Sequence, residues 1–347
     1  MRDIRFRYII VRGGADYSEI HALEGSPPSL RMAESGEIKM SMSGYFMDPG
    51  DSVDWMSDQI RPEMILDGTV YPLGVYLPAT IEVRENAAER SVYVEAYDRC
   101  WMVQDHCAES SVYFAAGSNY IEVVESLLAE CGIALILKTE TTETLAEARE
   151  DWTIGTSYLT IINQLLDEIN YNPLWFNESG LAVLEPASSP NQDSVEHVLS
   201  DRDPDTMVLP TFSRKTDIYR SPNVFIAVCS NADKSAPMVA RAENTNPQSP
   251  LSIQRRGRRI SSVKQVDNIS SQNELQAYAD RLLNESLITG EEITVQSALL
   301  PGFGVADVTG LEYGDVFTIC IERAWTMQLC AGGVMTHTLE KVVLNLE

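Results

Sequence analysis

Short segments in which apolar and polar side chains alternate are grouped at both ends of this 347-residue chain, and they constrain its fold more than any other feature. Near the N-terminus, Ile4, Phe6 and Tyr8 recur at every second position. This period places them on one face of a strand, because successive side chains of a strand point to opposite faces. Asp67-Gly68, between two apolar runs, is the strongest hairpin signal in the chain. Further strands are predicted over 38–42, 73–77, 80–84 and 91–97. The first hundred residues therefore predict an antiparallel barrel or sandwich.

A helical pattern replaces the strand pattern after about residue 112. Asn119 followed by Glu122 resembles a capping box that precedes an apolar stripe. A second amphipathic helix is predicted over 157–169. The apolar runs 173–176 and 181–184 are separated by a glycine-containing turn and predict a hairpin. This part of the chain therefore predicts an α/β module.

Strand patterns return after residue 206 and are interrupted once. The run 223–229 predicts a buried strand, whereas the polar, proline-containing stretch 232–250 predicts a loop. Ser271 with Glu274 forms a capping box at the start of a third helix. The last residues again predict strands, over 293–299, 316–321, 325–330 and 335–346.

The order of these segments predicts an α+β fold made mainly of antiparallel β-structure. The predicted domains are a first β-domain over 1–111, an inserted α/β domain over 112–205, a second β-domain over 206–231 and 292–347, and an insertion with a loop and a helix over 232–291. The length of the chain suits several domains of this size, each with its own core.

The formal net charge of -25 limits the classes of partner. A protein that grips nucleic acid needs Lys and Arg against the phosphates, so this class is not expected. An acidic wall can instead line a conduit past which nucleic acid slides, although solubility alone also explains an acidic protein. The charge is uneven: residues 101–215 hold 19 Asp and Glu against 5 Lys and Arg, a net of -14. That region is expected to be well solvated or to face something cationic.

One basic cluster stands out in this acidic chain. Arg255, Arg256, Arg258 and Arg259 surround a single glycine. A concentrated positive site suits electrostatic docking onto an acidic patch of a neighbouring subunit. A solvated strand or loop explains the cluster equally well. We take these four residues as the candidate inter-subunit contact.

No pattern of catalytic residues is evident. The four histidines, His21, His106, His197 and His337, lie in no nucleophile-elbow motif or other local signature. His106 and Cys107 would point to opposite faces of a strand. Neither a Walker-type loop nor a G-x-G-x-x-G motif is present, so no nucleotide cofactor is expected. The chain is predicted not to be an enzyme and to need no cofactor.

The sequence evidence for a metal site is also weak. Asp201, Asp203 and Asp205 resemble the start of a calcium loop, but Pro204 interrupts it and Thr206 stands where the loop needs glycine. An acidic turn is the preferred interpretation. The six cysteines form no C-x-x-C pair and suggest no disulfide framework, so free thiols are predicted.

Several local strings form an ordered series along the chain. They are RPEMILDGTVYPLGV (61–75), Tyr97-Asp98 before Trp101, WTIGTSYLTIINQLLDEINYNPLW (152–175), Asn223-Val224, the proline-containing stretch 246–250, and LEYGDVF (311–317) with Pro301 displaced upstream. In this order they resemble the hub proteins of long-tailed bacteriophages and related contractile particles. That group includes prophage proteins often labelled tail endopeptidases, and the late-control protein D group.

The resemblance covers nearly the whole chain and implies two tail-tube-like β-barrels with inserted α/β segments. It implies a homotrimer whose six barrels form a ring that matches a six-fold tail tube above it. The implied partners are a distal tail or tail-tube hexamer, spike, fibre or receptor-binding proteins, the tape-measure protein in the channel, and DNA in transient passage. Some relatives continue into a peptidoglycan-cleaving domain, whereas this chain ends at Glu347 within the hub region, so that activity is not expected.

Two other functions stay open beside a structural hub that closes the tube and lets DNA pass. One is a tail-associated peptidoglycan hydrolase, and the other is a different tail-tip part such as an adaptor or a receptor-binding protein. The N-terminus lacks a secretion signal, and the longest apolar runs are far shorter than a membrane span. We therefore expect assembly in the bacterial host cytoplasm, a final place at the virion tail tip, and no stable membrane insertion.

Overall fold

Antiparallel strands dominate the computed structural model, which describes residues 2–85, 90–150, 152–187, 190, 192–216, 221–229, 237–266, 269, 271–286 and 288–342. The predicted α+β class with mainly antiparallel β-structure is therefore confirmed. Within these residues no helix is both long enough and apolar enough to cross a membrane.

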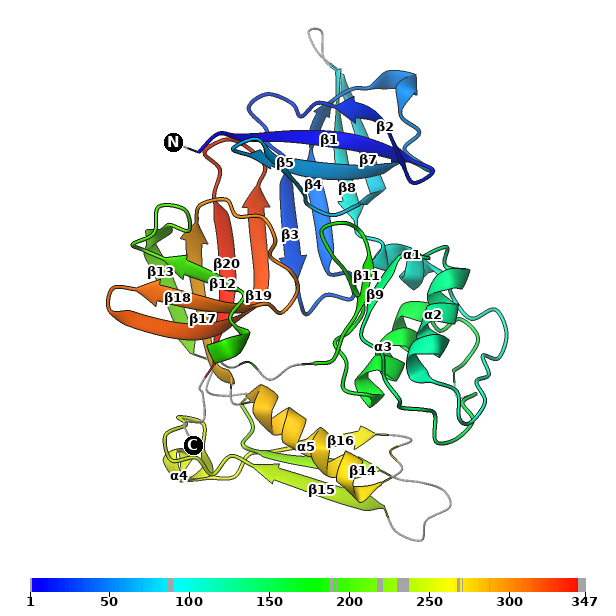
Figure 1. Ribbon diagram of the computed structural model, residues 1–347, viewed down its shortest axis with the longest axis vertical. Helices are drawn as coiled ribbons and strands as arrows, with labels where there is room; N and C mark the ends of the chain where they lie inside the picture. The colour runs from blue at the N-terminus through cyan, green and yellow to red at the C-terminus, as the bar shows by residue number, and fades with distance from the viewer. Residues whose placement is uncertain are drawn as a thin grey trace.

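The first β-region forms two layers that cross each other (Figure 1). One layer is a four-stranded sheet with the order β2 (Ala15–Ile20), β1 (Ile4–Arg12), β5 (Gln59–Leu66) and β6 (Thr69–Pro72). Its inner residues, among them Tyr8 and Ile10, pack with Met42 and Phe46 of the other layer in one core. The predicted hairpin at Asp67-Gly68 is confirmed as the β5–β6 turn. Both residues have positive φ, 48° and 86°, which a two-residue hairpin turn of this type requires.

The other layer belongs to a ten-stranded sheet that runs through both β-regions. Its main path is β13 (Val208–Thr216), β17 (Ile288–Ser297), β20 (Met335–Val342), β19 (Val316–Gln328), β3 (Ser29–Ala33), β4 (Met40–Met47), β8 (Arg90–Tyr97) and β7 (Leu77–Glu85). Off this path, β12 (His197–Ser200) pairs with β18 (Val308–Tyr313), and β18 pairs with β19. One apolar core extends across both regions.

The two β-regions implied by the resemblance are present, but among the described strands they are not closed barrels, because they share this sheet. The predicted strands 316–321 and 325–330 form one strand, β19, of 13 residues. Its first half pairs with β18, and its second half, from Ala324 to Gln328, pairs with β3. Because β19 is longer than β18 and β3, it pairs with strands of both β-regions. Among the described strands, the path of this sheet ends at β13 and at β7, each with one paired neighbour.

The α/β module has a core of its own. Helices α1 (Cys100–Asp105), α2 (Tyr120–Glu130) and α3 (Tyr158–Glu168) pack with a small sheet of β10 (Trp175–Phe176), β11 (Ala182–Leu184) and β9 (Ile136–Lys138). The Asn119 side chain accepts hydrogen bonds from the amides of Ile121 and Glu122, as the capping pattern predicts. The predicted hairpin is β10–β11. This core includes Cys100 and so begins upstream of the predicted boundary at 112.

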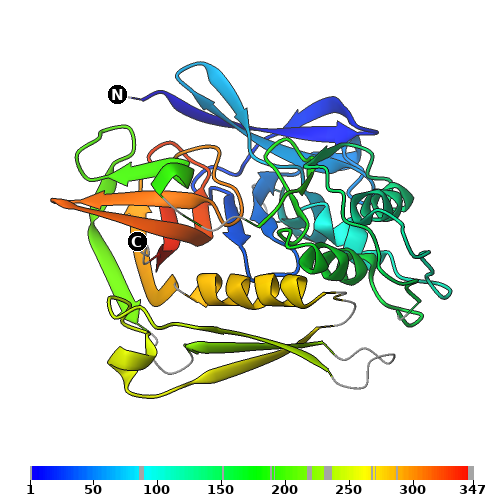
Figure 2. The ribbon, with the colours of Figure 1, turned by 60° about the horizontal axis from the view of Figure 1, so that its bottom comes forward.

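The insertion forms a second small layered unit, which lies below the rest of the molecule in Figure 2 and contacts α3 through the ion pair of 2.7 Å between Arg281 and Asp167. Strand β14 (Val224–Cys229) lies between β15 (Met238–Glu243) and β16 (Ser261–Val266), and α5 (Gln272–Ser286) covers one face. Ser271 and Glu274 exchange both hydrogen bonds of the predicted capping box.

Two predictions for this unit differ from the structure. The strand at 223–229 is predicted for the second β-domain but pairs inside the insertion. The stretch 232–250 is predicted as a loop but contains β15, while its residues 232–236 lie outside the described residues. The alternation of β15 is hard to recognise in the sequence, because its buried positions are small alanines inside a polar stretch.

Candidate functional site

The two open ends of the ten-stranded sheet are the first candidate surface for assembly. At one end, β7 pairs only with β8 among the described strands, and Val83 is 51% exposed. At the other end, β13 pairs with β17, and its exposed Arg214 and Lys215 lie 3.8 and 3.9 Å from Glu291 and Glu292. Open strand edges carry backbone donors and acceptors that can pair with another chain.

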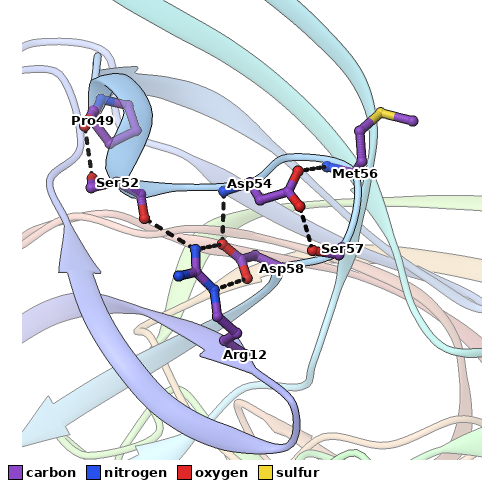
Figure 3. Close-up of polar contacts among 7 residues, drawn as sticks. All are labelled: Arg12, Pro49, Ser52, Asp54, Met56, Ser57 and Asp58. Carbon is purple, nitrogen blue, oxygen red and sulfur yellow. Dashed lines mark hydrogen bonds and ion pairs between the residues drawn. The ribbon is translucent and has the colours of Figure 1, made fainter.

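A rigid loop between β4 and β5 is the second candidate surface (Figure 3). It contains a short 3-10 helix, η1 (Gly50–Ser52). Asp58 is buried and accepts two hydrogen bonds from the Arg12 guanidinium, at 2.7 and 2.6 Å, and a third from the Asp54 amide. Its bonds to Arg12 lower the pKa of the Asp58 carboxyl despite burial. The Asp54 carboxylate in turn accepts from the amide of Met56 and the hydroxyl of Ser57.

The loop holds an apolar side chain in solvent. Met56 is 95% exposed at its tip, and the hydrogen bonds around it fix the backbone that carries it. The segment before the loop is also tied to the first residue of β8 by an ion pair of 2.6 Å between Arg90 and Asp48. Met56 offers this loop one apolar contact point, but single exposed apolar residues are common on protein surfaces and do not by themselves mark an interface.

The four predicted site residues lie together in one turn at the end of the insertion. Helix α4 (Ile253–Arg256) is capped by the Ser252 side chain and ends at Gly257, whose φ is 62°. The structure divides the four arginines into two pairs. Arg256 donates to the carbonyl of Ser221, and Arg259 pairs with Glu243, so both brace the insertion. Arg255, Arg258 and Arg259 are exposed, and of these three Arg259 is the one held by Glu243.

A buried serine, histidine and glutamate form an arrangement that sequence reasoning missed. The Ser297 hydroxyl lies 2.8 Å from His337 Nε2, and His337 Nδ1 lies 2.7 Å from Glu322 Oε2. These are the distances of a nucleophile, a base and an orienting carboxylate. The residues come from β17, β20 and β19, with no local motif to reveal them. The only hint is the strand period, which places His337 on the inner face with Met335 and Leu339.

The burial of this triad argues against catalysis. All three residues are 0% exposed, and the Ser297 hydroxyl also donates to the carbonyl of Ala298 at 2.8 Å. A substrate therefore has no path to the hydroxyl oxygen in this conformation. Burial raises the pKa of the Glu322 carboxyl, and the adjacent His337 opposes this rise. The arrangement acts as a polar link between three strands of the sheet.

A second histidine extends this network. The Phe303 ring lies between the two imidazoles, with ring centroids 4.0 Å from His197 and 4.9 Å from His337. His197 Nε2 is 3.2 Å from Asp307. Burial acts to lower the pKa of His197, but the hydrogen bond and the charge of Asp307 outweigh it, so the pKa is raised.

The other candidate ligands are engaged locally. Asp201 accepts from the amide of Gly314, and Asp203 accepts from the amide of Asp205, as expected of an acidic turn. All six cysteines are free thiols, as predicted, and burial raises the pKa of the Cys131 thiol to about 11. Among the described residues, no group of three His, Cys, Asp or Glu side chains could hold a metal ion.

Sequence comparison and structure comparison give different results for this chain. No protein-family model and no curated protein sequence matches it. Solved structures do match over almost its full length. A tail protein from Neisseria meningitidis MC58 is 12% identical, covers 97% of this chain and 96% of its own, and has a TM-score of 0.68. The 43 kDa tail protein of prophage MuSo2 from Shewanella oneidensis is 8% identical, with coverage of 96% and 98% and a TM-score of 0.66.

A third structure agrees with these two. Prophage tail protein gp18 from Listeria monocytogenes EGD-e is 12% identical, covers 96% of this chain and 94% of its own, and has a TM-score of 0.61. The matched region of these structures covers both β-regions, the α/β module and the insertion of this chain. The chain therefore has the fold of bacteriophage tail proteins.

Proposed function

We propose that this protein is a structural hub at the distal end of a bacteriophage-type tail, with no enzymatic role. The observation that carries the proposal is the ten-stranded sheet, which places two β-regions side by side and, within the part of the chain that the structure describes, leaves both of its ends open. Three copies that join end to end would form a closed ring of six β-regions. Ring closure would remove the open edges, which are otherwise sites of uncontrolled strand pairing.

The charges at the two edges suit such a contact. Exposed Glu82, Arg84 and Glu85 give β7 a net charge of -1, with Arg84 3.0 Å from Glu82, whereas exposed Arg214 and Lys215 give β13 a net charge of +2. Opposite charges across neighbouring strands favour their pairing, and like charges oppose it. The β7 edge of one copy would therefore meet the β13 edge of the next, and not a second β7 edge.

The ring would close the tail tube and open for the genome. A ring of six β-regions matches a six-fold distal tail or tail-tube ring above it, and the loop that carries Met56 is a candidate contact with that ring. Spike, fibre or receptor-binding proteins would attach below. The net charge of -25 would let the tape-measure protein or DNA pass without binding tightly. This function places the protein at the virion tail tip after assembly in the host cytoplasm.

The alternative function is a tail-associated peptidoglycan hydrolase, and the buried triad of Ser297, His337 and Glu322 is the observation that favours it. It requires the sheet to open so that a substrate reaches Ser297, which is 0% exposed. A zymogram with cell walls as substrate tests it. We expect no clearing by the wild type. Clearing that Ser297→Ala abolishes would establish the hydrolase instead.

Light scattering and particle images of the purified protein test the hub proposal directly. The expected mass is three times the 38.6 kDa of the chain, in particles that have three-fold symmetry and a central channel. A monomer at every concentration, or a particle without a channel, would contradict the proposal.

A further inference from the structure

The insertion differs from the rest of the chain in the sign of its charge. Residues 221–286 contain 8 Lys and Arg against 6 Asp and Glu, a net of +2, so the remaining residues carry a net of -27. Arg255, Arg258 and Arg259 are exposed in the segment 255–259 that we name the arginine turn, where Arg259 pairs with Glu243 of the same unit. A fixed basic turn in an acidic protein is a candidate docking surface for an acidic partner.

The α/β module presents a surface of the opposite sign. Its segment 139–150, which we name the glutamate segment, contains Glu140, Glu143, Glu147 and Glu150, and all four are exposed. Glu140 lies 3.0 Å from Lys138, whose amine also contacts Glu125. The segment is held near its middle by the bridge between Asn119 and Thr144, and near its end by the bridge between Phe114 and Arg149.

The two surfaces lie on opposite sides of the molecule. In Figures 1 and 2 the arginine turn at α4 lies on the side of β13, whereas the α/β module lies on the other side, next to the strands that lead to β7. They therefore cannot meet within one chain. If the β7 edge of one copy joins the β13 edge of the next, the module of the first copy comes to the side where the arginine turn of the second lies.

We infer that the arginine turn of one copy docks onto the glutamate segment of the adjacent copy in the ring. This inference rests on the proposed trimer and assigns it a second contact besides the sheet edges. The contact joins two different surfaces, so each copy uses each surface once and the ring closes after three. It also gives the strongly acidic module a cationic neighbour. A charged contact of this kind sets the direction of assembly and is sensitive to salt.

A charge swap tests the inference. The variant Arg255→Glu/Arg258→Glu is expected to raise the Kd of the trimer by about tenfold or more at an ionic strength of about 0.05 M. Glu143→Arg/Glu150→Arg is expected to have a similar effect. In a ring of three copies drawn from a mixture of these two variants, at least two neighbours are the same variant, so one repulsive contact stays. The chain that carries all four substitutions is instead expected to recover the wild-type Kd. All four side chains are exposed, so the fold should be retained.

The control carries the same change of charge at another place. Arg5→Glu/Arg31→Glu reverses two exposed arginines of the first β-region and is expected to leave the Kd within about twofold of the wild type, because neither lies at a proposed contact. A trimeric wild type whose Kd is unchanged by both reversals, or is not recovered by the swap, would overturn this inference alone. A monomeric wild type would overturn the proposed ring as well.

Discussion

At the scale of single residues, the buried carboxylate of Asp98 links two parts of the fold. Asp98 lies where β8 passes into α1, and its two oxygens accept the amides of Met40 and Cys100, each at 2.9 Å. It is 2% exposed, and burial raises the pKa of its carboxyl to about 7 in spite of these bonds. One side chain thus joins the ten-stranded sheet to the α/β module.

The raised pKa predicts how stability depends on pH. Because the folded pKa exceeds the unfolded value of about 4, the folded state binds this proton more strongly. The contribution of Asp98 is therefore greatest below about pH 4 and falls as the pH rises through about 7. Asp98→Asn removes this dependence, so the stability that it costs should be smaller at pH 8 than at pH 5. Urea denaturation at both pH values measures this difference.

The exposed Asp51 supplies the control for this comparison. Asp51→Asn should change the free energy of unfolding little at either pH. An equal loss of stability at pH 5 and pH 8 in Asp98→Asn would show that Asp98 titrates at its ordinary pKa.

At the scale of elements, β19 is the strand that decides the architecture, because it changes partner along its length. Arg323 lies at the change, between the residues that pair with β18 and those that pair with β3. Its guanidinium contacts Glu34, beyond the end of β3, at 2.9 Å and Glu340 of β20 at 2.7 Å. The two β-regions are thus linked by the ion pairs of Arg323 as well as by the strand β19.

Removal of this side chain should loosen the junction. We expect Arg323→Ala to lower the free energy of unfolding by about 1–3 kcal/mol, because two half-buried carboxylates lose a charged donor. Hydrogen exchange should accelerate in β3 and in the second half of β19. Arg31→Ala, at an exposed position of β3, is the control and should change stability by less than about 0.5 kcal/mol. Faster exchange that is confined to the insertion would contradict this role.

At the scale of the whole molecule, the open sheet edges predict that assembly is built on strand contacts. Val83→Lys places a charge on the exposed β7 edge, a substitution that natural sheets use to block edge pairing. The monomer should fold normally, and the Kd of the trimer should rise by about tenfold or more. Sedimentation velocity measures the change. Val70→Lys, at a 43% exposed position of β6, is the matched control, and an equal effect of both would argue against a contact at β7.

The sequence by itself determined most elements of the fold. The β5–β6 turn needs positive φ at Asp67 and Gly68, and the capped helices begin with Asn119 and Ser271, so local chemistry is enough to place them. The class of the fold followed from the order of these elements. The strand β15 was not apparent, because its short alternation lies inside a polar stretch with prolines.

Only the tertiary structure decided which strands share a sheet and which side chains meet. Strand pairing depends on contacts between residues far apart in the chain, so β19 could join β3 across almost 300 residues without any local signal. For the same reason the sequence could not bring Ser297, His337 and Glu322 together, and it could not show that Arg256 and Arg259 of the arginine turn bond within the insertion. Local patterns determine elements, whereas burial and long-range pairing determine surfaces.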